Sequence, residues 1–270
     1  MKYDLHVHSN ISDGKVSREE IIKHAIENKL ECIAFTEHND FVSDDKCILS
    51  DDLIFINGIE FDTFYDKSFH TLCYFGNKNN VIDKLINKYR ENSNDRSEEL
   101  IKRISEQHKI DIDLINLQTF CNKKYITKRD IIDWLIFNKY AQSVHEASYK
   151  FTGKTATSYV PKYSFDFKDV AEVIKNIDGK LVLAHPSSLK YNLDELEVFI
   201  KRLIDLGLDG IEVVNSSKIE EIQTQLYKLI ANNYNLLMSG GSDFHSFDKD
   251  KLGVQGDESK KLIKTFSNFN

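Results

Sequence analysis

Short apolar runs alternate with longer amphipathic stretches along most of the chain. The apolar runs have the length of buried strands, and the stretches after them show the i, i+3, i+4 spacing of helices. The predicted strands lie at 3–7, 31–35, 53–56, 59–65, 71–75, 180–184, 210–214 and 235–238. Repeated strand-then-helix units predict an α/β fold with a parallel sheet and helices outside it.

Helix signals follow several of these strands. Ser17 and Glu20 have the spacing of a capping box, and Ile21 and Ile22 begin an apolar helical face behind it. Further helices are predicted at 193–206 and 218–232.

The alternation breaks between residues 81 and 164. Four consecutive helices are predicted there, at 81–107, 111–121, 127–138 and 143–151. We therefore expect one domain made of residues 1–80 and 165–270, with residues 81–164 as an inserted helical subdomain. The insertion is equally consistent with a lid over an active site and with a subdomain that only packs.

Composition narrows the class of protein. The chain has 270 residues, of which 41% are hydrophobic and 29% charged, as in ordinary globular domains. The net charge of −7 argues against binding to long nucleic acid. We find no leader peptide and no apolar run of membrane-spanning length. Together with four scattered cysteines (Cys32, Cys47, Cys73 and Cys121), this predicts a cytoplasmic protein with reduced thiols and no membrane partner.

The most informative segment is Asp-Leu-His-Val-His-Ser at residues 4–9. Side chains alternate along a strand, so His6 and His8 project from one face and form half of a metal site. Other histidines and carboxylates also lie near predicted strand ends: Asp13, His38, Glu60, His70, His185, Asp243 and His245.

Each of these residues alone has an ordinary explanation as a turn, a cap or a surface side chain. Glu60 is harder to explain, because it lies in an apolar run where an unpaired carboxylate is unfavourable. Glycines at 240 and 241 allow a close backbone approach before Asp243. Together the set holds six of the nine histidines and three carboxylates. Such a set suits two or three divalent ions, with Mn, Zn and Fe all compatible.

The order of these motifs resembles that of the polymerase and histidinol phosphatase (PHP) family. The resemblance runs through residues 4–9, 36–39, 58–60, 184–186 and 241–245. It implies a distorted (β/α)7 TIM-like barrel with the site at its carboxyl mouth, and a trinuclear metal site. Carried over, His6, His8, Glu60 and Asp243 hold one ion. Glu60, His70 and His185 hold the second, and Asp13, His38 and His245 hold the third.

The insertion resembles that of a stand-alone branch acting on nucleoside monophosphates, 3′,5′-bisphosphate nucleotides or short RNA. The matching segments are Arg96, Arg103, Ile126-Thr127-Lys128 and Tyr159-Val160-Pro161-Lys162. The chain departs from that branch, which tends to show Thr-Arg-Pro-His at 127–130, Arg at 162 and Asp-His-Asp at 37–39. We expect substrate contacts from Arg96, Arg103, Lys128, Arg129 and Lys162.

We therefore predict a metal-dependent phosphoesterase acting on small phosphorylated substrates, with nucleotides or short oligonucleotides foremost. Attack by a metal-bridging hydroxide needs no protein nucleophile, and we expect Glu60, His185 and His245 to be the catalytic residues. Three divalent ions and three carboxylates leave about +3 to attract a phosphate. A histidinol-phosphate phosphatase and a non-catalytic metal-binding module are the alternatives. A DNA-proofreading nuclease is disfavoured by the acidic chain.

Overall fold

The computed structural model describes residues 1–42, 53–76, 80–123 and 125–266. The chain divides into two compact units, which are described separately: unit 1 is Met1–Ile82 with Ser164–Asn270, and unit 2 is Asp83–Tyr163. Cys32, Cys73 and Cys121 are free thiols, and Cys47 lies outside the described residues.

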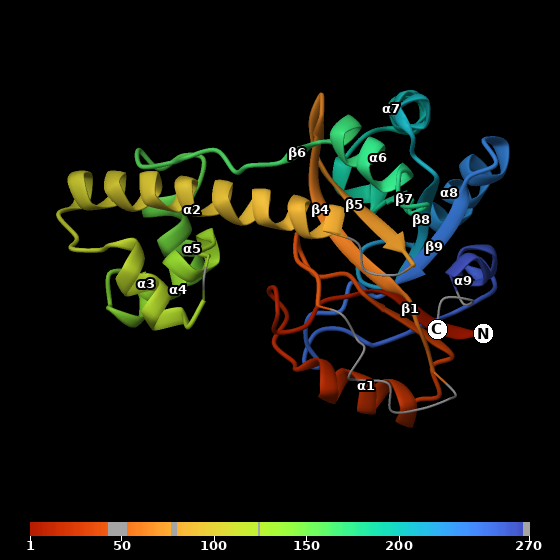
Figure 1. Ribbon diagram of the computed structural model, residues 1–270, viewed down its shortest axis with the longest axis horizontal. Coiled ribbons are helices and arrows are strands. Elements are labelled where there is room, and N and C mark those ends of the chain that lie inside the picture. Colours follow the sequence, from red (N-terminus) through yellow and green to blue (C-terminus); the bar gives the residue numbers. More distant parts are fainter. Residues whose placement is uncertain (43–52, 77–79, 124, 267–270) are drawn as a thin grey trace. The chain divides into compact units, whose positions relative to one another are not determined.

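Unit 1 is a mixed α/β structure built on two sheets (Figure 1). The strands of the first sheet, in order, are β10 (Val254–Gln255), β1 (Lys2–Val7), β2 (Cys32–Phe35) and β3 (Ile54–Phe55). Those of the second are β6 (Phe165–Asp166), β4 (Asn57–Tyr65), β5 (Lys67–Phe75), β7 (Lys180–Leu183), β8 (Gly210–Asn215) and β9 (Leu237–Gly241). The neighbours β1–β2–β3 and β7–β8–β9 are parallel, as the sequence pattern predicts.

Strand β5 departs from the predicted pattern, because it pairs antiparallel with both β4 and β7. A tight turn at Asp66, with a φ of 58°, joins β4 to β5. The strand predicted at 71–75 therefore starts at Lys67, and His70 lies inside it, not before it. The polar residues 66–68 resemble a loop in sequence, but the outer end of a hairpin tolerates polar side chains.

The two sheets meet where β1 and β2 end. Among the described residues, the isolated bridges Val7–Phe244 and His38–Glu60 join them, and no closed (β/α)7 barrel is found. The bridges matter for the site, because His8 N donates to Phe244 O (2.9 Å) and Asn39 N donates to Glu60 O (2.9 Å).

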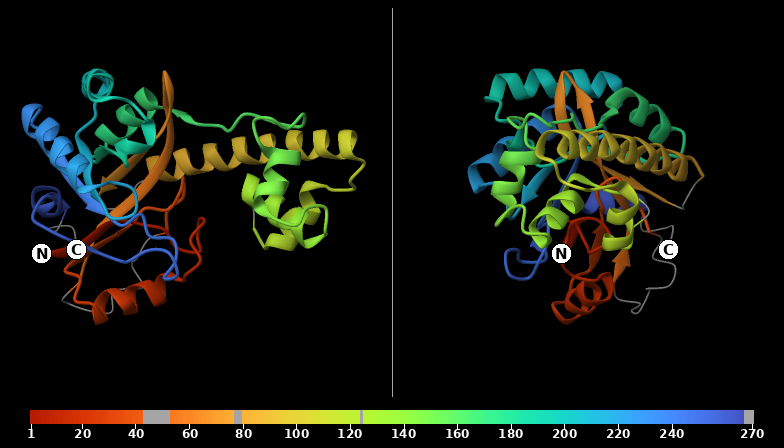
Figure 2. Two further views of the ribbon diagram at one scale, coloured as in Figure 1. Left: turned by 180° about the vertical axis from the view of Figure 1, so that it is seen from behind. Right: turned by 90° about the vertical axis from the view of Figure 1, so that its left-hand side faces the viewer.

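Helices cover both sheets of unit 1 (Figures 1 and 2). Helix α1 (Arg18–Glu27) carries the predicted capping box of Ser17 and Glu20 and buries Ile21 and Ile22 against the first sheet. The helices α6 (Phe167–Lys175), α7 (Leu193–Leu206) and α8 (Glu221–Asn233) lie along one side of the second sheet. A short 3-10 turn (Pro186–Leu189) and α9 (Lys260–Phe266) complete the unit.

The helices predicted for the insertion are present. They are α2 (Asn80–His108), α3 (Leu114–Cys121), α4 (Lys128–Phe137) and α5 (Val144–Ala147), the last continued by a π-turn at Ser148–Thr152. Leu100, Ile104, Leu117, Ile131 and Leu135 form part of an apolar core of their own. Thr127 caps α4 in a capping box with Asp130.

A buried carboxylate fixes the end of β1 that leads into the histidine pair. Asp4 accepts hydrogen bonds from Ser242 N (2.9 Å), Ser242 Oγ (2.6 Å), Gly253 N (2.7 Å) and His6 N (3.2 Å). Burial raises the pKa of Asp4 to about 6, although these donors oppose the shift. Asp4 therefore ties β1 to the loop after β9.

We expect Asp4→Ala to lower the free energy of unfolding by about 3 kcal/mol or more, because it leaves several buried donors without an acceptor. Ser17→Ala, which removes an exposed helix cap, is the control and should lower it by about 1 kcal/mol. Urea denaturation of both variants measures the difference. Equal, small losses would show that Asp4 does not hold the strand in place.

Candidate metal centre

Strand β1 places its two histidines on one face. The rings of His6 and His8 lie 5.2 Å apart, centroid to centroid, and both side chains are fully buried. Strand β9 passes close beside them, since a Cβ at Gly241 would lie 2.6 Å from the Cβ of His6. Glycine at this position therefore lets the Asp243 loop reach the histidines.

Glu60 and Asp243 face this histidine pair. His8 Nε2 lies 3.1 Å from Glu60 Oε2 and 3.3 Å from Asp243 Oδ1, and His6 Nε2 lies 3.4 Å from each of the same two oxygens. Ligand atoms about 2.0–2.1 Å from a tetrahedral zinc lie about 3.3 Å from one another. The four atoms thus have the spacing of a metal's ligand set.

The other oxygen of Glu60 meets a second group of imidazoles. Glu60 Oε1 lies 2.9 Å from His70 Nδ1 and 3.0 Å from His185 Nε2. His38 Nδ1 lies 3.2 Å from Glu60 Oε2. One carboxylate is therefore shared between two groups of histidines.

A third group gathers around Asp13. Asp13 Oδ1 lies 3.3 Å from His245 Nε2 and 3.9 Å from His8 Nδ1, and Asp13 Oδ2 lies 3.8 Å from His38 Nε2. The Asp13 side chain is 46% exposed, whereas Glu60 is 1% exposed. The centre is therefore open to solvent on the Asp13 side.

These groups fit divalent metal ions. Ligand atoms of His8, Asp13, His38 and His245 lie within 4.8 Å of one another, as do those of His6, His8, Glu60 and Asp243, and those of His38, Glu60 and His70. Within the described chain, buried atoms at the centre have no hydrogen-bond partner: His6 Nε2, both ring nitrogens of His8, His38 Nδ1 and Glu60 Oε2. Unpaired buried nitrogens and oxygens that face one another are what a metal ion would satisfy.

The electrostatics of the centre favour bound cations. Burial alone would lower the pKa of His8 and His70, but the nearby carboxylates outweigh it and raise these values to about 9 and about 10. Burial would raise the pKa of Glu60, but His70, His6 and His38 hold it well below its usual range. Burial lowers the pKa of His38 to about 4.

Sequence reasoning missed two carboxylates that orient these histidines. Glu212 in β8 is fully buried, and its Oε1 lies 2.9 Å from His6 Nδ1 while its Oε2 accepts from His185 N (2.5 Å). A carboxylate on one ring nitrogen turns the other toward a metal. The available signal was the one that drew attention to Glu60, a lone acidic residue inside an apolar strand.

The second missed carboxylate is Asp62, and it explains the unusual Asn39. Asn39 Nδ2 donates to Asp62 Oδ2 (2.5 Å), and Asp62 N donates to Asn39 Oδ1 (2.9 Å). Asp62 Oδ1 in turn lies 3.0 Å from His70 Nε2. An aspartate at position 39 would place two carboxylates against each other, whereas the amide of Asn39 donates a hydrogen bond to Asp62 beside His70.

Glu37 has a supporting role in the same motif. Its carboxylate accepts hydrogen bonds from Ser9 N (3.1 Å) and Ser12 Oγ (2.6 Å), and Ser9 Oγ also donates to it. These bonds hold the loop between His8 and Asp13, so Glu37 acts on the ligand groups indirectly, through Ser9 and Ser12.

The cations predicted to bind substrate divide into two kinds within unit 2. Arg103 pairs with Glu99 (2.7 Å) and Arg129 with Asp133 (2.9 Å), so their charges are already balanced. Lys128 is different: partial burial and the nearby charges of Arg96 and Lys162 lower its pKa. The positive charges of Arg96, Lys128 and Lys162 therefore lie near one another, and the Arg96 guanidinium also donates to Val160 O (3.1 Å) and Pro161 O (3.0 Å).

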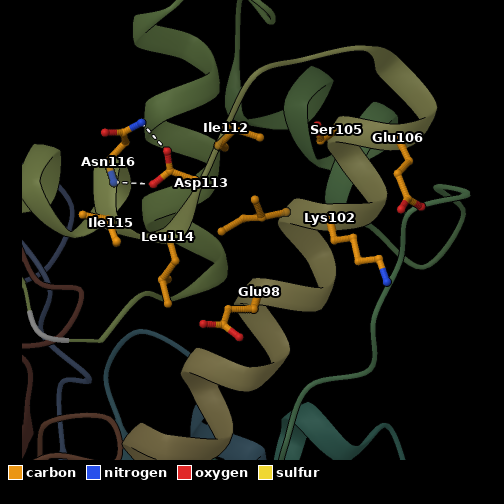
Figure 3. A pocket seen from close by; sticks show the side chains of 10 residues that line it. Glu98, Lys102, Ser105, Glu106, Ile112, Asp113, Leu114, Ile115 and Asn116 are labelled. Carbon is orange, nitrogen blue, oxygen red and sulfur yellow. Dashed lines mark hydrogen bonds between the residues drawn. The ribbon is translucent and has the colours of Figure 1, made fainter.

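Unit 2 also carries an open hollow of about 760 Å³ between α2 and the start of α3 (Figure 3). Glu98, Lys102, Ile112 and Asn116 are among the residues that line it. None of the residues predicted to bind metal or substrate lines this hollow. In the described part of the chain, no helix is both long and apolar enough to cross a membrane.

Comparison with known proteins gives consistent matches. The PHP domain family model matches residues 4–182. The 5′-3′ exoribonuclease Rnm of Escherichia coli (strain K12) is 25% identical over 252 residues, covering 90% of this chain and 85% of that protein. A phosphoribosyl 1,2-cyclic phosphate 1,2-diphosphodiesterase of Eggerthella lenta is 24% identical, covering 90% of this chain and 93% of that protein.

The fold also matches a solved structure. A candidate metal-dependent phosphoesterase from Bifidobacterium adolescentis superposes with a TM-score of 0.79 at 23% sequence identity, covering 97% of this chain and 95% of the other. At this identity the match speaks for the fold alone.

Metal affinity should rise with pH. Because the carboxylates keep protons on His8 and His70 in the metal-free protein, a metal ion must displace these protons. We expect the affinity for Mn²⁺ to rise roughly tenfold per pH unit for each displaced proton between about pH 6 and 9. Chelator competition measures the affinity at each pH. A constant affinity over this range would show that metal binding displaces no proton from His8 or His70.

Proposed function

The chain belongs to the PHP domain family and is a metal-dependent phosphoesterase, and we propose that its substrates are nucleotides or short RNA carrying a 5′-phosphate. Nucleoside monophosphates and 3′,5′-bisphosphate nucleotides are the smallest members of that class. The observation that carries the metal-dependent chemistry of the proposal is the position of Glu60. Its carboxylate lies within 3.4 Å of five imidazoles, and it belongs to two ligand groups at once.

We assign three divalent ions to these groups. His6, His8, Glu60 and Asp243 hold the first ion, Glu60, His70 and His185 the second, and Asp13, His38 and His245 the third. The first group matches one set of mutually close ligand atoms, and Glu60 lies 2.9 Å from His70 and 3.0 Å from His185. The atoms that lie within 4.8 Å of one another also place His38 with Glu60 and His70, and His8 with Asp13, His38 and His245. When bound, such ions act as Lewis acids on a phosphoryl group and lower the pKa of coordinated water toward neutrality. Mn, Zn and Fe all suit the ligands.

The protein's own residues hold the ligand groups in position. Glu60 fixes the spacing of two ligand groups, and Glu212 and Asp62 fix the orientation of His6 and His70. His185 and His245 approach Glu60 and Asp13 from the loops after β7 and β9. His245 and Asp13 lie on the solvent-exposed side, where a phosphate ester has access.

The local charge favours a phosphate. Asp13, Glu60, Asp62, Glu212 and Asp243 contribute negative charge at or beside the centre. The ammonium of Lys218, which contacts Asp243, contributes one positive charge. With three divalent ions the net charge of the centre is about +2. This is lower than the value of about +3 that the three ligand carboxylates alone give, and it still attracts an anion.

Charge is unevenly distributed along the chain in a way that supports a nucleotide or RNA substrate. Residues 83–163 hold 15 Lys and Arg against 11 Asp and Glu, a net charge of +4. The remaining residues hold 21 against 32, a net charge of −11. We propose that Arg96, Lys128 and Lys162 bind a further phosphate of the substrate. We expect Arg103 and Arg129, whose charges are balanced, to contribute less.

A substrate panel on the Mn²⁺-loaded protein tests the proposal. It should include AMP, adenosine 3′,5′-bisphosphate, a short RNA with and without its 5′-phosphate, a ribose 1,2-cyclic phosphate and histidinol phosphate. We expect the highest kcat/KM on the nucleotide bisphosphate or the 5′-phosphorylated RNA. A preference for histidinol phosphate would identify the protein as a histidinol-phosphate phosphatase instead. A preference for the cyclic phosphate would overturn the nucleotide proposal.

Lys128→Ala should reduce kcat/KM on the nucleotide bisphosphate about ten- to a hundredfold, the effect of losing one charge-assisted phosphate contact. Turnover of a small generic phosphoester should change little. Arg129→Ala is the matched control, because Arg129 is adjacent in sequence but paired with Asp133. Steady-state kinetics of both variants on both substrates measure the effect. If Lys128→Ala loses the same activity on the two substrates, Lys128 does not bind the further phosphate.

A further inference from the structure

We propose that Lys218 binds the phosphoryl group of the substrate at the metal centre. The inference deepens the proposed function and rests on it. Lys218 follows β8 and lies in unit 1, the unit that contains all nine predicted metal ligands. None of the sequence motifs includes it.

The backbone at Lys218 is held by the end of β8. Asn215 Oδ1 accepts hydrogen bonds from Ser217 N (3.1 Å) and Lys218 N (3.0 Å). The carbonyl of Asn215 accepts from Ile219 N (2.9 Å). Asn215 Nδ2 donates to both oxygens of Glu212 (3.2 Å each), the carboxylate that orients His6. The position of this loop is therefore coupled to the position of a metal-facing histidine.

Two serines connect the same loop to its neighbours. Ser217 Oγ donates to Ser242 O (2.6 Å), in the residue before Asp243. Ser187 Oγ donates to Lys218 O (2.9 Å) from the turn that follows His185. Loops that carry two proposed metal ligands thus hold Lys218 from both sides. Such support is typical of a side chain whose position matters for chemistry.

The ammonium of Lys218 contacts the metal centre without competing for the metal. It pairs with Oδ2 of Asp243, whereas Oδ1 of Asp243 faces His6 and His8. An ammonium has three donors, and no second partner of this one occurs within the described chain. Two N–H groups are thus available beside the ions that would hold a phosphate.

The ammonium of Lys218 reaches solvent while it pairs with a buried carboxylate. The Asp243 side chain is 2% exposed, whereas that of Lys218 is 42% exposed. Full burial would add a desolvation cost to the ammonium. Its partial exposure leaves the rest of the ammonium accessible to an anion from solvent.

The test uses Mn²⁺-loaded wild type, Lys218→Met, Lys218→Arg and Lys180→Met. Lys180 is the matched control, because it pairs with Asp209 (3.2 Å) at comparable exposure and lies at the end of β7 away from His185. Three quantities are measured: bound metal by elemental analysis, affinity for inorganic phosphate by calorimetry, and kcat/KM on a nucleoside monophosphate.

Lys218→Met should weaken phosphate binding and kcat/KM about ten- to a hundredfold with unchanged metal content. Lys218→Arg should recover most of both, and Lys180→Met should match wild type. The proposal is overturned if Lys218→Met binds phosphate as tightly as the control. It is also overturned if the loss follows loss of metal, since Lys218 then acts only through Asp243. A wild type that binds phosphate but hydrolyses no phosphoester would contradict the proposed function alone.

Discussion

The carboxylate of Glu60 is surrounded by five imidazoles and is almost completely buried, and the fold around it follows from that arrangement. A buried carboxylate is unfavourable unless positive charge lies beside it. Without metal, His6, His8 and His70 provide that charge, because their raised pKa values keep protons on these rings, and metal ions would replace those protons. Five segments each place a histidine beside the carboxylate of Glu60 or of Asp243. They are the ends of β1, β2, β7 and β9 and the hairpin β4–β5.

A second layer of polar groups fixes the histidines in position. Glu212 orients His6 and holds the backbone of His185, and the Asn39–Asp62 pair orients His70. The same layer gives Asn39 a structural role. Its amide donates to Asp62, whereas an aspartate at position 39 would place a second carboxylate against Asp62.

Much of this arrangement was predictable from sequence. Strand alternation places His6 and His8 on one face, and parallel strands bring their carboxyl ends together, so the gathering of His38, His185 and His245 follows from local patterns. The hairpin β4–β5 was not predictable from such patterns, because its polar turn resembles a loop. Glu212 carried the same signal as Glu60, an acidic residue inside an apolar strand, but its contact with His6 joins segments far apart in the chain. Lys218 had no such signal, and its role depends on a long-range contact that periodicity does not reveal.

If Glu60 is shared between metal sites, the number of bound ions should depend on it. Wild type and Glu60→Gln are reconstituted with Mn²⁺ under identical conditions, freed of excess metal and measured by elemental analysis, with circular dichroism as the check on folding. Wild type should bind two to three ions per chain. The substitution should weaken two sites together, so that the folded variant retains at most one ion. A folded Glu60→Gln protein with the full metal content would show that Glu60 is not shared between metal sites.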